Sequence, residues 1–230
     1  MIKSLIAFAV CAAIAVPTLW YTVVASYKMD KFASEAARTS LEVTEEQSAE
    51  LNQSALRSDA IVFAAWGAAL AACTALCSAG ARNLPLRFLG IVVGVLAGAG
   101  AGWATANLGF WFDHAVRFEP TTTYWAQKWG LMYLPIAGAV AISVIAAGNL
   151  KNAVDCIVGA VVGSCLAVFV YCILLGLVTP LEGHDAGFPV TNENRLVFLI
   201  GSFVLVGGST LLLGARSLEK PLPPGPEERS

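Results

Sequence analysis

The clearest pattern along the chain is the separation of its apolar residues from its charged residues. Six stretches contain no Asp, Glu, Lys or Arg: residues 4–27, 60–79, 88–112, 131–150, 156–178 and 196–215. At about 1.5 Å of rise per residue, a helix of each length can cross the roughly 30 Å hydrocarbon layer of a membrane. A backbone in lipid has to satisfy its own hydrogen bonds, and no stretch alternates as a barrel strand does. The pattern therefore predicts six transmembrane helices.

Composition supports the same interpretation. The chain is 57% hydrophobic and 13% charged, with a mean hydropathy of +0.69, whereas soluble domains are about 25% charged. All 14 Lys and Arg and all 16 Asp and Glu lie outside the six stretches. This separation excludes a globular cytosolic enzyme, a nucleic-acid-binding domain and a disordered chain. The predicted fold class is all-α: a polytopic membrane protein with six transmembrane helices in three hairpins, which contacts the lipid bilayer and no nucleic acid.

The basic residues predict an orientation. If six helices alternate, the tight connections that carry Arg82, Arg87 and Lys151 lie on one side of the membrane together with both termini. Tight basic connections favour the cytoplasmic side, so we expect a multi-pass protein of the cell membrane (plasma or inner) with both termini cytoplasmic. The first apolar run exceeds the 7–15 residues of a signal-peptide core, and residues 1–27 are therefore interpreted as a retained signal anchor.

Two segments differ from the membrane helices, which continue through residues 60–217. Residues 28–59 hold seven acidic and four basic residues, and we expect a charged outer helical hairpin that turns near residues 39–44. Thr44 and Gln47 have the spacing of a capping box; the alternative is an unstructured acidic loop. Residues 218–230 include four prolines and no apolar periodicity, which predicts a disordered inner tail.

Glycines recur at helical spacing in two of the stretches. Gly at i, i+4 and i+8 leaves a helix face without side chains, so that another backbone can approach closely. We therefore predict helix packing at these positions; the alternative is the lining of a pore or of a groove for lipid. The third and fifth stretches match in spacing, which raises the possibility of a parallel hairpin repeat. The glycines are Gly90, Gly94 and Gly98, with Gly159 and Gly163 in the fifth stretch.

Candidate chemistry is sparse. A charge in the middle of a membrane is costly and is kept where ions or protons move, and no apolar stretch contains one. His114 beside Asp113 and His184 beside Asp185 are predicted at the outer surface, where two imidazoles and two carboxylates could bind a divalent metal. The alternative is two solvated loop histidines. The six cysteines are interpreted as packing residues, because none lies in a predicted outer connection.

Aromatic residues gather around the second outer connection, between the third and fourth apolar stretches. Tyr and Trp favour the headgroup region of a membrane, so Trp111, Tyr124, Trp125 and Trp129 predict an interfacial belt. Alternatively, Trp125 and Trp129, one helical turn apart, stack on a ligand or a partner.

These features favour a non-catalytic integral membrane protein. Its small-residue faces would pack helices together, and its outer hairpin would contact a partner membrane protein or a second copy, as in an accessory or assembly subunit. A facilitative permease or channel for a small neutral solute is the first alternative. A metal-dependent outer-surface activity at His114 and His184 is the second. No cofactor is predicted other than this divalent metal.

Overall fold

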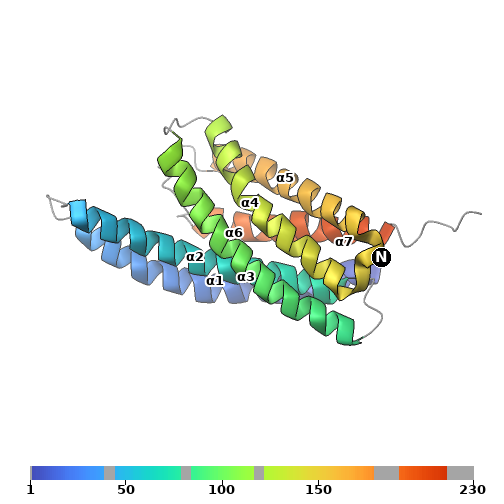
Figure 1. Ribbon diagram of the computed structural model, residues 1–230. Coiled ribbons are helices and arrows are strands. Elements are labelled where there is room, and N and C mark those ends of the chain that lie inside the picture. The colour runs from blue at the N-terminus through green and yellow to red at the C-terminus, as the bar shows by residue number, and fades with distance from the viewer. Residues whose placement is uncertain (1, 39–44, 79–83, 117–121, 179–191, 217–230) are drawn as a thin grey trace, which may run out of the picture.

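The computed structural model describes residues 2–38, 45–78, 84–116, 122–178 and 192–216, and the regular structure in these ranges is helical throughout. Figure 1 shows the long helices packed side by side as a bundle. Three short helical turns, η1, η2 and η3, interrupt them. In chain order the elements are α1 (Ile2–Arg38), α2 (Glu45–Cys77), α3 (Leu84–Ala115), α4 (Thr122–Val144), η1 (Ile145–Asn149), η2 (Leu150–Asn152), α5 (Ala153–Val178), α6 (Asn192–Ser202), η3 (Phe203–Gly207) and α7 (Gly208–Arg216).

Successive helices from α1 to α5 run in opposite directions along the bundle, and α6, η3 and α7 continue one another as the last pass. In Figure 1, α1 begins and α7 ends at the same end of the molecule, here called the terminal end. The α3–α4 end lies opposite, where α3 finishes and α4 starts. The helices α1 and α2 reach past α3 at that end (Figure 1). The turn predicted between them at residues 39–44 and the tail at residues 218–230 lie outside the described residues.

Five helical stretches in the described ranges are long and apolar enough to cross a membrane. They are Ile2–Val23, Gln53–Cys77, Leu84–Ala115, Thr123–Leu174 and Arg195–Ala215. The all-helical class and the presence of several candidate membrane spans are therefore confirmed. The fourth stretch, of 52 residues, includes both α4 and α5. A straight helix of that length would measure about 78 Å, but the chain reverses direction within it (Figure 1).

The reversal between α4 and α5 depends on one glycine. Gly148 has φ 104°, a left-handed conformation that side chains with a Cβ disfavour. The Asn149 amide donates to the Val144 carbonyl at 3.3 Å, and the Asn152 amide donates to the Gly214 carbonyl at 3.2 Å. The second bond joins the reversal to α7 and so fixes α5 beside the last helix.

Glycines bring α3 into backbone contact with α2. A Cβ added at Gly94 would lie 3.0 Å from the backbone of Ala71, one at Gly98 would overlap the carbonyl of Gly67, and one at Gly102 would overlap the carbonyl of Phe63. Each step of one turn along α3 is matched by a step of one turn back along α2. The two helices are therefore antiparallel and touch through their main chains at three positions over about two turns.

The other predicted packing glycines contact different helices. Gly90 faces Ala147 in η1, and Gly159 faces Thr210 of α7, whose Cα would lie 2.8 Å from an added Cβ. Gly163 faces the backbone of η3. Gly94 thus contacts the preceding hairpin, whereas its counterpart in the expected repeat, Gly163, contacts the following helix. The parallel repeat is not confirmed.

The first helix packs on α2. The Sγ atoms of Cys11 and Cys77 lie 3.7 Å apart, a contact between distant cysteines that the sequence does not reveal. Away from this contact, Ile6, Val10 and Ile14 of α1 are each more than half exposed. Their spacing of one turn gives a continuous apolar stripe suited to lipid.

Candidate functional site

Three polar side chains meet at the α3–α4 end and form what we call the polar anchor: Asp113, Tyr124 and Lys128. Asp113 lies in the last turn of α3, and the other two lie one turn apart at the start of α4. The Lys128 ammonium donates to Asp113 Oδ2 at 2.7 Å, and the Tyr124 hydroxyl donates to Asp113 Oδ1 at 2.6 Å. Lys128 Nζ also lies 5.5 Å from the centre of the Trp125 ring. The anchor joins the ends of two helices that a short connection separates.

Burial makes the polar anchor energetically important. The Lys128 side chain is 1% exposed and that of Asp113 is 16% exposed. Charges taken out of water lose their hydration, and removing one member of such a pair costs about 3–5 kcal/mol because the other remains uncompensated. Since each Asp113 oxygen already accepts a hydrogen bond, the geometry suits holding helices together better than proton transfer.

The anchor changes the interpretation of the predicted metal site. Asp113 is directed at Lys128 and Tyr124. His114 is exposed; its Nδ1 lies 2.8 Å from the Phe110 carbonyl and its ring lies 4.1 Å from the Phe110 ring. His184 and Asp185 lie outside the described residues. Within the described ranges, no three His, Cys, Asp or Glu side chains come together in a way that could hold a metal. The metal site stays a prediction.

Six aromatic side chains from four helices fill the centre of the bundle, and we call them the aromatic core. Each is at most 4% exposed, and adjacent rings have centroids 4.8–6.5 Å apart. Many of the pairs meet edge to face or tilted, which suits the ring quadrupoles. The members are Phe63 and Trp66 of α2, Trp129 and Tyr133 of α4, Tyr171 of α5 and Phe198 of α6.

Hydrogen bonds join the aromatic core to its neighbours. The Tyr133 hydroxyl and the Ser202 hydroxyl lie 2.7 Å apart. The Thr105 hydroxyl on α3 donates to the Met132 carbonyl on α4 at 2.8 Å. These bonds satisfy polar groups beside the rings, whereas the buried Trp66 Nε1 has no hydrogen-bond partner among the described residues. The rings occupy the space between α2, α4, α5 and α6 that a solute path would need.

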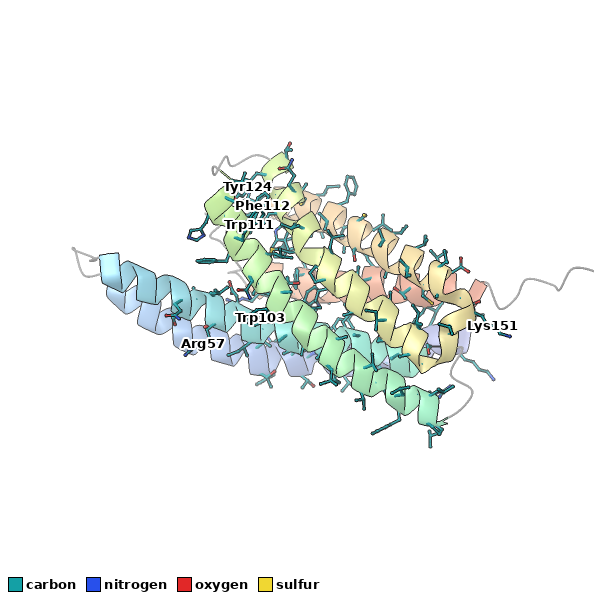
Figure 2. All side chains as sticks on the ribbon, viewed as in Figure 1. Arg57, Trp103, Trp111, Phe112, Tyr124 and Lys151 are labelled. Carbon is teal, nitrogen blue, oxygen red and sulfur yellow. The ribbon has the colours of Figure 1, made fainter. Side chains whose placement is uncertain are left out.

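The burial of aromatic side chains also bears on the predicted interfacial belt. Trp111 is 59% exposed, as a side chain that contacts headgroups has to be. Tyr124 and Trp129 are buried at 4% and 3%, and Trp125 is half-buried. Figure 2 shows Trp111, Phe112 and Tyr124 together at the α3–α4 end. Tyr124 and Trp129 therefore face the inside of the bundle, and the interfacial belt itself stays a prediction.

Comparison with known proteins gives no match: no family model fits the chain, and no curated protein or solved structure is significantly similar to it. The fold itself therefore defines the class, which is an all-helical protein with several helices long and apolar enough to cross a membrane.

Proposed function

We propose that the protein is a multi-pass integral protein of the plasma or inner membrane with six crossings. In this proposal α1 to α5 each cross once, and α6 and α7 together form the last crossing. The lengths support it, since the 23 residues of α4 and the 26 residues of α5 correspond to about 34 Å and about 39 Å. With Arg87 and Lys151 in tight basic connections, the terminal end is cytoplasmic and the α3–α4 end is external.

We further propose a non-catalytic role as an accessory or assembly subunit. The observation that carries it is the aromatic core, whose contacting rings occupy the centre of the bundle. Beside them lies a cavity of about 240 Å³ that Tyr133, Tyr171 and Phe198 help to line. A permease for a neutral solute would need these rings to move apart. A metal-dependent activity would need the Asp113 carboxylate, which already pairs with Lys128 and Tyr124 in the polar anchor. Otherwise it would need other metal ligands in place of Asp113.

The external contact surface in this proposal is the paired end of α1 and α2. These helices have 37 and 33 residues, about 55 Å and about 50 Å, so each exceeds the roughly 30 Å hydrocarbon layer. The excess extends the charged segment 28–59 beyond the membrane, where a partner membrane protein or a second copy of the chain can bind it.

The test is the composition of the complex in native membranes. The tagged full-length protein is extracted in a mild detergent and separated by native electrophoresis, and its bands are identified by mass spectrometry. We expect a complex larger than one chain, which charge reversal at Glu45, Glu46 and Glu50 to Lys disrupts. The matched control reverses Glu219, Glu227 and Glu228 in the tail and leaves the complex intact.

Two results would contradict the proposed role. One is a single-chain species that neither set of substitutions alters. The other is rapid entry of a neutral solute such as glycerol into proteoliposomes that contain the protein, which would favour the permease.

A further inference from the structure

The exposed side of the α2–α3 pair has a groove with two chemically different halves. Its volume is about 460 Å³, and α2 and α3 both line it. Gln53, Arg57 and Asn107 supply polar groups at one part, and Ile61, Ala64 and Trp103 supply apolar surface at the other. Figure 2 shows Arg57 and Trp103 on these two helices.

The groove follows from the local packing of the two helices. The glycine contacts hold the backbones of α2 and α3 together, and the small Ala64 side chain leaves room above them. Trp103 and Ile61 border this space and are 61% and 57% exposed. An exposed tryptophan and isoleucine beside an open groove present apolar surface to a ligand that arrives from the membrane.

The depth of the groove matches a headgroup. The rise from Cys77 to Arg57 along α2 is about 30 Å, and the rise from Phe88, where the apolar run of α3 begins, to Trp103 is about 22 Å. If the terminal end lies at one membrane surface, Arg57 lies at the opposite surface, one hydrocarbon thickness away, and Trp103 lies in the outer part of the hydrocarbon layer. Arg57 is then at phosphate depth, and Trp103 lies beside the acyl chains.

The polar half fits a phosphate group. A guanidinium offers donors in a planar fork that binds phosphate oxygens in pairs. The Asn107 amide donates to the Trp103 carbonyl at 2.8 Å, which fixes its orientation and leaves its second N–H and its oxygen for another partner. Gln53 adds a second amide on the α2 side.

We propose that this groove binds one anionic phospholipid. Its phosphate pairs with Arg57, its ester region contacts the amides of Gln53 and Asn107, and one acyl chain lies along Ile61, Ala64 and Trp103. The apolar half and the depth favour a lipid over a water-soluble phosphate. The inference rests on the proposed membrane orientation and is independent of the accessory role.

Native mass spectrometry of the purified full-length protein tests this site. The protein is titrated with phosphatidylglycerol, with phosphatidylcholine, and with glycerol phosphate as a headgroup without acyl chains. We expect one phosphatidylglycerol to be retained under activation that removes phosphatidylcholine, and no retention of glycerol phosphate. Arg57→Gln should weaken the binding of phosphatidylglycerol about tenfold or more, since it removes a charge-assisted pair.

Matched variants separate the site from general effects of charge or folding. Lys151→Gln removes an exposed cation at the terminal end and should leave lipid retention unchanged. Trp103→Ala removes apolar contact, keeps the cation, and should weaken both lipids. Thermal unfolding of each variant in detergent shows whether it folds; Arg57 and Trp103 are exposed, so we expect near wild-type values.

Three results would overturn the lipid site. The first is that Arg57→Gln retains phosphatidylglycerol as well as the unmodified protein does, and the second is that Trp103→Ala leaves lipid retention unchanged. The third is that glycerol phosphate binds as tightly as the lipid, which would make this a soluble-phosphate site. The lipid titration uses the purified protein without a partner subunit, so its result does not depend on the accessory role. A failure of the lipid site and a failure of the accessory role are therefore distinguishable.

Discussion

At the scale of single residues, Lys128 illustrates how the bundle contains a charged side chain in its interior. Its ammonium group is 2.7 Å from the Asp113 carboxylate and 5.5 Å from the Trp125 ring. The opposite charge, the Tyr124 hydroxyl on the other carboxylate oxygen and the aromatic face together replace part of the lost hydration. The cluster is neutral overall, which suits a site close to the membrane.

We predict that Lys128→Met lowers the free energy of unfolding by about 3 kcal/mol, because Asp113 keeps its charge without its cation. Thermal or denaturant unfolding in detergent measures the change. The exposed Lys151 provides the control, and Lys151→Met should change stability by at most about 0.5 kcal/mol.

Adding Asp113→Asn to Lys128→Met should recover part of the lost stability, since it removes the uncompensated charge. If Lys128→Met were as mild as Lys151→Met, or if the second substitution only added to the loss, the polar anchor would not be a coupled pair.

The sequence identifies two of these residues but does not reveal how they meet, for a physical reason. It marks Asp113 as a candidate metal ligand and Tyr124 as a belt residue, and it does not single out Lys128. Tyr124 and Lys128 are one turn apart, which is the signal that could have placed them on one helix face. Their partner comes from another helix, and no pattern within α4 specifies which helix packs against it.

At the scale of helices, the contact between α2 and α3 depends on glycines of α3, which have no side chain to keep the two backbones apart. Gly98 and Gly102 each face an α2 carbonyl, whereas an added Cβ at Gly100 meets nothing within 4 Å. The helix therefore has one face where a methyl group would force the backbones apart and another where it would extend into free space.

We predict that Gly98→Ala destabilises the protein by about 1–3 kcal/mol, since overpacking separates α3 from α2 and forfeits dispersion contacts. Gly100→Ala, on the same helix, should be neutral or more stable by up to about 1 kcal/mol, because alanine favours the helix. Thermal unfolding of both variants under identical conditions compares them. Equal effects at the two positions would contradict the backbone contact.

The helices themselves are the part of the fold that the sequence specifies best. Lipid imposes helical hydrogen bonding on any long apolar run, so the run 88–112 reappears within α3, Leu84–Ala115. Its ends differ because polar residues such as Arg87 and Asp113 can continue a helix beyond the apolar layer. The glycine spacing indicates a close contact, but it cannot identify α2 as the partner of Gly94 and η3 as that of Gly163.

At the scale of the whole molecule, the bundle has two ends that differ. The terminal end has the start of α1, the α4–α5 reversal and the end of α7, and the opposite end has the polar anchor and the extended α1–α2 pair (Figure 1). Between the ends, the aromatic core occupies the centre of the bundle, beside a cavity of about 240 Å³ between α4, α5 and α6. We expect binding on the surfaces, at the predicted outer hairpin and in the α2–α3 groove.

The central claim is that α4 and α5 are separate crossings, so that both chain ends lie in the cytoplasm. Single cysteines at Lys3, Ser48, Thr122 and Ser217, in a background without the native six, are exposed to an impermeant maleimide in intact and in permeabilised cells. The account predicts labelling of Ser48→Cys and Thr122→Cys in intact cells, and of Lys3→Cys and Ser217→Cys only after permeabilisation. Labelling of Ser217→Cys but not Lys3→Cys in intact cells would mean an odd number of crossings and would contradict it.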